Sequence, residues 1–185
     1  MLRITALICL FLLSFMSQAN PQSTLYQVDM IVFAHKQVSK NDSSNTTPVL
    51  VSDMRQAIEL KNTASSALTP YHTLPASSSQ LSSEYWALTR KSNYQILAHY
   101  SWLQPANNQR PIAFSATNRN GWNLEGTVRV RRSNYYLLDT DLVFSTPGQN
   151  PTTFSFAQKQ RLKPGTVYYL DHPQAGVLIK VHQVT

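Results

Sequence analysis

The sequence has few of the residues that build covalent, metal and phosphate sites. It contains one cysteine, Cys9, and only five glycines in 185 residues. Cys9 lies within the N-terminal apolar run, so a chain cleaved after that run has no thiol for catalysis, a disulfide or a zinc site. The sequence also lacks a Gly-rich phosphate loop and a G-x-S-x-G nucleophile motif. We therefore expect a protein that works without a cofactor.

Only one apolar run is long, and it lies at the N-terminus. Arg3 precedes a mostly apolar stretch from Ile4 to Met16, and Ser17-Gln18-Ala19 places small residues where a signal peptidase reads the chain. The run is too short to span a membrane and leads directly into polar sequence. We therefore predict that residues 1–19 are a cleaved signal peptide. Residues 20–185 are expected to form a single exported domain without a transmembrane segment.

Acidic residues are scarce, with nine Asp and Glu against sixteen Lys and Arg, and the net charge is +7. In an exported protein this excess of positive charge favours anionic surfaces, lipid headgroups or acidic wall polymers over nucleic acid. The alternative is a soluble domain that is basic without a charged partner. The five histidines are scattered and do not have the spacing of a metal site.

Alternating apolar residues indicate a β-rich domain. The predicted strands are Thr24–Ala34, Asn93–Pro105, Pro111–Ala116, Trp122–Arg131, Tyr135–Phe144, Thr153–Leu162, Thr166–Leu170 and Val177–Gln183. Helical spacing predicts a helix from Leu81 to about Lys91 and a short one within Ser52–Lys61, which lies in a polar, variable segment at residues 36–79. The expected fold is α+β, a largely antiparallel sheet of six to eight strands with one or two helices packed on one face.

The central strands constrain each other's register, because directly opposed residues share a face of the sheet. A three-residue loop, Arg132–Asn134, keeps the apolar residues of both strands on one face. The expected pairs are Val130 with Tyr136, Val128 with Leu138, Leu124 with Leu142, Trp122 with Phe144, Phe144 with Phe154, and Leu142 with Phe156.

This register gathers basic residues on the other face of the sheet. Asp139 is expected opposite Lys159, and Tyr135 between Arg131 and Lys163. The candidate binding residues for carboxylates and sugar faces are Arg129, Arg131, Tyr135, Lys159, Arg161 and Lys163. The alternative is a solvated sheet face that Asp139 partly neutralises.

Glu125 and Asp141 are expected to face each other on the same side of the sheet. Opposed carboxylates raise one another's pKa, and such a pair serves glycosidases. A pair near arginines is more often salt-bridged, so we favour a structural role and expect no catalytic residues.

The segment Y-Y-L-D-H-P-Q-A-G, residues 168–176, suggests either a catalytic pair or a turn. Pro173 restricts His172 to extended backbone, and Asp171 is expected to accept backbone hydrogen bonds in an Asx-type turn. Gly176 is expected to let the chain enter the last strand. We therefore predict a structural turn, with any ligand role carried by the exposed member of Tyr168 and Tyr169.

Four segments resemble the CsiV-type peptidoglycan-binding proteins, which are exported by Gram-negative bacteria. These segments are Y-Q-V-D-M-I-V-F, Y-Q-I-L-A-H-Y-S-W-L-Q-P, the pair L-E-G-T-V-R-V and Y-Y-L-L-D-T-D-L, and the terminal R-L-K-P-G-T-V-Y-Y-L-D-H-P-Q-A-G-V-L-I. The terminal segment, with Tyr169, Asp171, His172, Pro173 and Gly176, is the most specific. The family's Glu and His are replaced here by Thr166 and Tyr168, and residues 36–79 carry no resemblance.

The resemblance implies a non-enzymatic periplasmic protein that binds peptidoglycan. It also implies an accessory role in cell-wall synthesis, cell division and cell shape, in which an outer-membrane lipoprotein is helped to activate a class A penicillin-binding protein. Two alternatives come from the residues themselves: a glycan hydrolase that uses Glu125 and Asp141, and a protein–protein adaptor without glycan binding.

Overall fold

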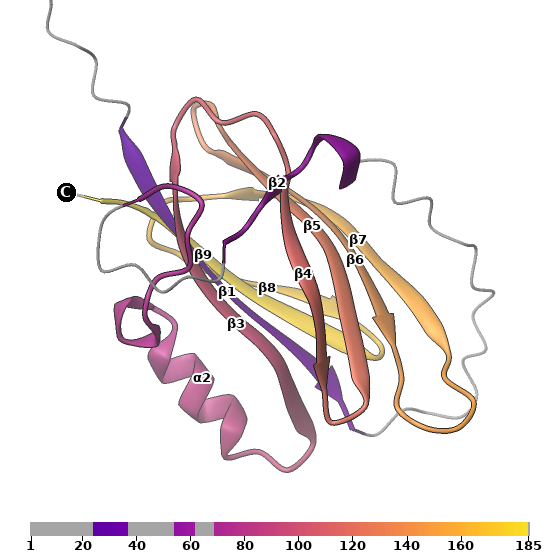
Figure 1. The fold of residues 1–185 in the computed structure, drawn as a ribbon. Coiled ribbons are helices and arrows are strands. Elements are labelled where there is room, and N and C mark those ends of the chain that lie inside the picture. The colour runs from indigo at the N-terminus through magenta and orange to yellow at the C-terminus, as the bar shows by residue number, and fades with distance from the viewer. Residues whose placement is uncertain (1–23, 37–53, 62–68, 185) are drawn as a thin grey trace, which may run out of the picture.

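The computed structural model describes residues 24–36, 54–61 and 69–184. Within these ranges the chain forms a four-stranded sheet of order β3-β1-β9-β8, a five-stranded sheet of order β2-β4-β5-β6-β7, and one α-helix (Figure 1). The elements are β1 (Leu25–His35), the 3-10 helix η2 (Met54–Gln56), β2 (Ile58–Glu59), the 3-10 helix η3 (Ala76–Ser78), α2 (Ser82–Thr89), β3 (Tyr94–Pro105), β4 (Ile112–Arg119), β5 (Trp122–Arg132), β6 (Tyr136–Ser145), β7 (Thr153–Leu162), β8 (Val167–His172) and β9 (Ala175–Gln183).

The predicted mixture of antiparallel strands and helix is confirmed, and the arrangement differs in two respects. The described residues form nine strands rather than six to eight, and two sheets rather than one. The additional strand is β2, which pairs in parallel with β4 where a short helix was expected. Ile58 N–H donates to the carbonyl of Pro111 (2.8 Å), and Leu60 N–H donates to that of Ala113 (2.9 Å). These bonds satisfy the backbone groups that a helix would otherwise have paired internally.

The main core lies between the two sheets, and β1 contributes to it with alternate side chains. Tyr26, Val28, Met30 and Val32 are buried against the inward residues of the five-stranded sheet, as their shared face predicted. On the other face of β1, Ile31 and Phe33 are also buried, in a second cluster. Since β1 is apolar on both sides, it occupies an interior position in its sheet.

The second cluster lies beneath α2. Leu81, Tyr85 and Leu88 pack there with Ile31, Phe33 and Ile96, so the helix covers the face of the four-stranded sheet that points away from the main core.

A β-bulge in β3 divides its side chains between the two clusters. The register shifts where β1 passes from Val32 to Phe33, so Leu97 is the extra residue between Ile96 and Ala98. Ile96 consequently packs in the cluster under α2, while Ala98 packs in the main core. The predicted common face of Tyr94 and Ile96 with Ala98, Tyr100 and Trp102 is therefore wrong, because one inserted residue reverses the alternation.

The register of β6 with β7 is as predicted, with Phe144 opposite Phe154 and Leu142 opposite Phe156. The register of β5 with β6 differs from the prediction by two residues, and Val130 lies opposite Leu138. The turn is Ser133–Tyr135, closed by a hydrogen bond from Ser133 N–H to the Tyr135 carbonyl (2.8 Å). A shift of two residues leaves every side chain on its original face, so the apolar pattern alone does not distinguish these registers.

Parts of the chain lie outside the described residues. They include the whole predicted signal peptide and most of the polar segment at residues 36–79. Within the described ranges, no helix has the length and apolar character needed to cross a membrane.

Candidate functional site

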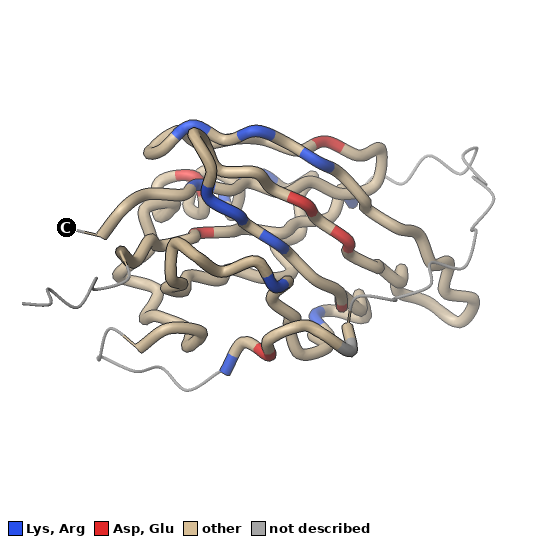
Figure 2. Tube along the Cα trace, turned by 90° about the horizontal axis from the view of Figure 1, so that it is seen from above, with Lys and Arg blue, Asp and Glu red and all other residues tan. Residues whose placement is uncertain are grey.

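The candidate site is a group of basic side chains on the outward face of the five-stranded sheet. We call it the basic strip, and it consists of Arg129, Arg131, Lys159, Arg161, Lys163 and Tyr135. Cross-strand pairing brings β5, β6 and β7 together here, with Arg129 opposite Asp139 and Asp139 opposite Lys159. Figure 2 shows blue basic positions on neighbouring strands of this sheet, with red acidic positions on the strand between them.

Asp139 holds two arginines of the strip. Its Oδ2 atom lies 2.9 Å from Nη2 of Arg129 and 3.0 Å from Nη2 of Arg131. The carboxylate side chain is only 16% exposed. Both arginines share this one acceptor, so the contacts orient the two guanidinium groups. One carboxylate neutralises only one of the two positive charges.

Tyr135 and Arg161 form the second contact of the strip. The guanidinium carbon of Arg161 lies 4.9 Å from the centroid of the Tyr135 ring, which is 40% exposed. Tyr135 was expected between Arg131 and Lys163, but it lies in the β5–β6 turn against Arg161. In the described part of the chain, no carboxylate pairs with Lys159, Arg161 or Lys163.

The predicted direct pairing of Glu125 with Asp141 is wrong. Glu125 lies opposite Val143, and Asp141 lies opposite Thr127, because of the two-residue shift between β5 and β6. The hydrolase hypothesis required opposed carboxylates, and this geometry is absent. Among the described residues, no three His, Cys, Asp or Glu side chains gather as a metal site would require.

The terminal segment forms a tight β-hairpin. His172 pairs with Ala175 across Pro173 and Gln174, and Asp171 pairs with Gly176. The expected Asx-type turn is wrong, because the Asp171 carboxylate accepts the hydroxyl hydrogen of Tyr169 instead of a backbone N–H. The backbone N–H of Gln174 donates to Nδ1 of His172 (3.2 Å).

His172 also contacts the other sheet. Its ring is stacked on Phe154 of β7, with centroids 4.8 Å apart and planes at 5°. Burial lowers the pKa of His172 below its ordinary value. The turn therefore joins β8 and β7, the edge strands of the two sheets, through this ring contact.

Gly176 has a steric role rather than the expected conformational one. It lies within β9, opposite Asp171, and a side chain there would overlap the Phe33 ring and lie 2.8 Å from Cε2 of Tyr169. The Phe33 and Tyr169 rings are stacked with centroids 6.0 Å apart. Tyr169 is 51% exposed, whereas the hydroxyl of Tyr168 accepts the backbone N–H of Lys163 (3.0 Å). Tyr169 is thus the exposed member of the pair.

Comparison with known proteins identifies the family. A family model described as "Peptidoglycan-binding protein, CsiV" matches residues 2–184, nearly the whole chain. The chain belongs to this family. No curated protein and no solved structure matches it. Peptidoglycan binding is thus supported as the general function by the description of the CsiV family.

Three of the four segments that resemble the CsiV family lie together in the four-stranded sheet. They are β1, β3 and the β8–β9 hairpin, and the remaining segment forms β5 and β6 of the other sheet. Tyr168 lies at the position where the resemblance described above implies a His. Its hydroxyl closes the turn before β8 by accepting from Lys163, so this position has a structural role in the present chain.

Sequence reasoning missed one buried polar cluster in the CsiV fold, at Asp29. This residue is fully buried, and its Oδ1 accepts from Gln27 Nε2 (2.8 Å) and Ser101 Oγ (2.6 Å). Nδ1 of His182 lies 3.6 Å from the other carboxylate oxygen, and burial lowers the pKa of His182. A carboxylate within an otherwise apolar strand was the available signal, because a buried acid needs donors.

Proposed function

We propose that this CsiV-family protein is a non-enzymatic, periplasmic peptidoglycan-binding protein whose contact surface is the basic strip. The observation that carries the proposal is the charge of that surface, where basic residues of β5 and β7 lie on both sides of Asp139, which pairs with only two of them, Arg129 and Arg131. Membership of a peptidoglycan-binding family supports the class of ligand. The excess of arginine and lysine costs self-repulsion that an anionic polymer would relieve.

The side chains of the strip suit the chemistry of the cell wall. Peptidoglycan presents stem-peptide carboxylates and the faces of sugar rings. Lys159, Lys163 and the guanidinium of Arg161 provide donors for carboxylates, and Tyr135 provides an exposed aromatic face next to that guanidinium. Asp139 orients Arg129 and Arg131 toward the same surface, so that fewer side-chain torsions remain to be ordered on binding.

The binding site is tested by pelleting the protein without its signal peptide together with purified sacculi. We expect Lys159→Glu/Arg161→Glu to reduce the retained fraction strongly. The control Lys61→Glu/Arg90→Glu, which changes the net charge equally at exposed positions outside the strip, should be retained like the wild type. Retention should also fall with rising salt, because exposed charges are screened. Equal loss in both variants would show that only overall charge matters and would refute the strip as the site.

The absence of catalysis is tested separately by incubating sacculi with the protein and analysing released muropeptides. We expect no products above those of a buffer control. Products that disappear in Glu125→Gln would establish the hydrolase alternative instead.

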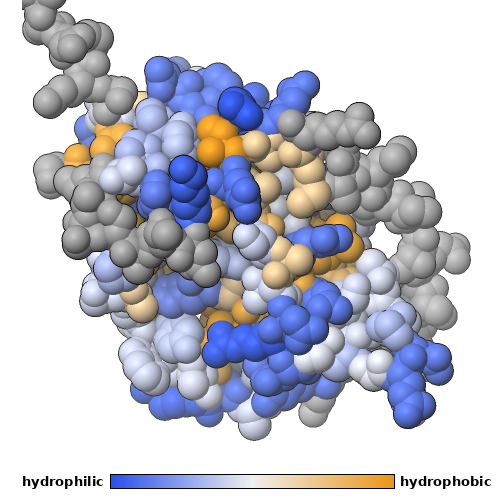
Figure 3. Space-filling model, viewed as in Figure 1, coloured by the Kyte–Doolittle hydropathy of each residue, from blue (hydrophilic) through white to orange (hydrophobic). Residues whose placement is uncertain are grey.

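We also propose an accessory role, in which the wall-bound protein helps an outer-membrane lipoprotein activate a class A penicillin-binding protein. This role is supported only by the family resemblance. In the view of Figure 3, polar side chains divide the apolar surface into small areas, which does not favour a large hydrophobic interface on that face. Crosslinking in cells tests the role. Capture of a lipoprotein or synthase by a protein that fails to pellet with sacculi would favour the pure adaptor alternative.

A further inference from the structure

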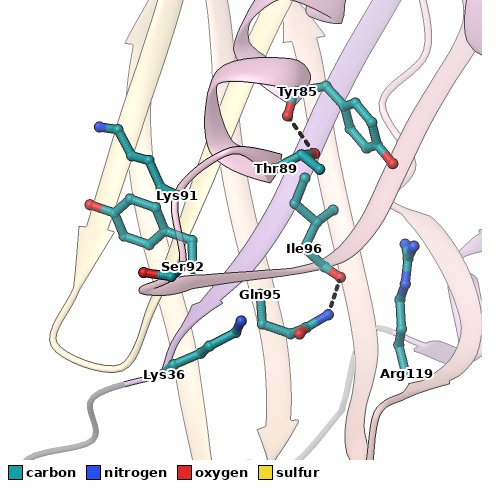
Figure 4. A pocket seen from close by; sticks show the side chains of 9 residues that line it. Lys36, Tyr85, Thr89, Lys91, Ser92, Gln95, Ile96 and Arg119 are labelled. Carbon is teal, nitrogen blue, oxygen red and sulfur yellow. Dashed lines mark hydrogen bonds between the residues drawn. The ribbon is translucent and has the colours of Figure 1, made fainter.

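A polar pocket with a volume of about 220 Å³ lies at the edge of the four-stranded sheet, away from the basic strip. It is formed where the end of β1, the end of α2, the start of β3 and the β4–β5 turn meet (Figure 4). The residues that line it are Lys36, Tyr85, Thr89, Lys91, Ser92, Tyr94, Gln95, Ile96 and Arg119. Figure 4 shows Lys36 and Arg119 on either side of Gln95, with Tyr85 and Thr89 contributed by α2.

Backbone hydrogen bonds and a tight turn fix the main chain at the three basic residues of the pocket, Lys36, Lys91 and Arg119. Lys36 N–H donates to the carbonyl of Asn93 (2.9 Å), and Lys91 N–H donates to that of Leu88 (3.0 Å). Arg119 is the last residue of β4 before the turn at Asn120 and Gly121, whose φ angles are 52° and 82°. This Asn-Gly pair suits the tight hairpin turn that pairs Arg119 with Trp122. The three basic residues are therefore brought together by tertiary structure from distant parts of the sequence.

The charge of the pocket is one-sided. No carboxylate is among the residues that line it. Lys91 Nζ lies 5.7 Å from the centroid of the Tyr94 ring. Three basic residues in a lining without a carboxylate create a positive potential that favours an anionic ligand.

The other lining groups favour a peptide carboxylate as that anion. Tyr85, Tyr94 and Ile96 supply apolar wall, and Ser92 and Gln95 supply hydroxyl and amide groups. The Gln95 amide N–H donates to the Ile96 carbonyl (3.3 Å), so the side chain is oriented by its own strand. The pocket is smaller than one that encloses a drug-sized molecule, so it would admit the end or a side chain of a peptide rather than a whole sugar chain.

We infer that this pocket binds the free carboxylates of peptidoglycan stem peptides, separately from the contacts of the basic strip. The inference rests on the proposed function, since stem peptides are the acidic part of that polymer. Two sites on one polymer raise the apparent affinity without either site being strong alone. The pocket would therefore bind the carboxylates of individual stem peptides, while the basic strip contacts the surface of the peptidoglycan polymer.

The inference is tested by titrating the protein calorimetrically with a soluble disaccharide-tetrapeptide muropeptide. The same muropeptide with its carboxylates converted to amides is the ligand control. We expect Lys36→Ala/Arg119→Ala to weaken binding by at least about tenfold, since each charge-assisted hydrogen bond accounts for a factor of this order. Arg90→Ala, an exposed neighbour of Lys91 that does not line the pocket, should bind the muropeptide like the wild type.

The outcomes separate this inference from the proposed function. Unchanged muropeptide binding in Lys36→Ala/Arg119→Ala, equal binding of the amidated ligand, or no binding by the wild type while it still pellets with sacculi would each overturn the pocket assignment alone. Muropeptide binding that depends on Lys36 and Arg119 would support the pocket even if the strip variant pelleted normally, in which case the strip assignment fails and the pocket stands.

Discussion

Gly176→Ala is expected to destabilise the protein through a steric overlap and not through backbone strain. Gly176 does not have a positive φ, so alanine accepts its backbone conformation. The added methyl would overlap the Phe33 ring and approach Cε2 of Tyr169 at 2.8 Å. Phe33 is 3% exposed and packs edge-on against Tyr94, so its ring has little room to move.

The magnitude follows from the cost of overpacking a core. An inserted methyl in a well-packed site costs about 1–3 kcal/mol. For a domain of this length each kcal/mol lowers the melting temperature by about 2–4 °C, so we expect a decrease of about 2–12 °C. Thermal unfolding followed by circular dichroism measures it.

A double-mutant cycle with Phe33→Leu tests the cause. A smaller side chain at position 33 makes room for the methyl, so Gly176→Ala should cost less in the Phe33→Leu background. Gly165→Ala is the matched control, because nothing lies within 4 Å of its added methyl and its φ of +71° makes any loss conformational. Its cost should be the same in both backgrounds. An unchanged melting temperature for Gly176→Ala, or an equal cost in both backgrounds, would refute the steric explanation.

Further predictions concern the buried and charged groups. Asp29→Ala is expected to lower the free energy of unfolding by about 1–3 kcal/mol, because it removes the acceptor for the buried Ser101 hydroxyl, and Asp29→Asn should cost less. Asp139→Asn is expected to increase sacculus retention at low salt, because it leaves the basic strip one charge more positive. Stability should also fall in mild acid. Burial lowers the pKa values of His99, His172 and His182 below the ordinary 6.5. The unfolded chain therefore binds protons at a higher pH than the folded chain, which destabilises the folded chain as the pH falls. Melting temperatures should decline below about pH 6.5 and be constant just above it.

The candidate sites differ in how far the sequence could predict them. The basic strip lies on consecutive hairpin strands, and its β6–β7 contacts, such as Asp139 opposite Lys159, were predictable from local alternation. The pocket of Lys36, Lys91 and Arg119 was not predictable, because it depends on how the end of β1, the end of α2 and the β4–β5 turn meet in space. No local sequence pattern predicts that these three segments lie next to one another.

Apart from β2 and the face assignment within the bulged β3, the sequence by itself determined which segments are strands and which face of each is apolar, because the two-residue period of a strand is a local property. The strand Thr153–Leu162 and the common face of Tyr26, Val28, Met30 and Val32 follow from that period alone. Tertiary structure decided the division into two sheets and the register of β5 with β6. It also created the steric requirement for glycine at position 176, where a side chain would overlap the Phe33 ring. Each of these depends on a neighbour remote in sequence, and alternative arrangements that bury the same faces are equivalent until those neighbours pack together.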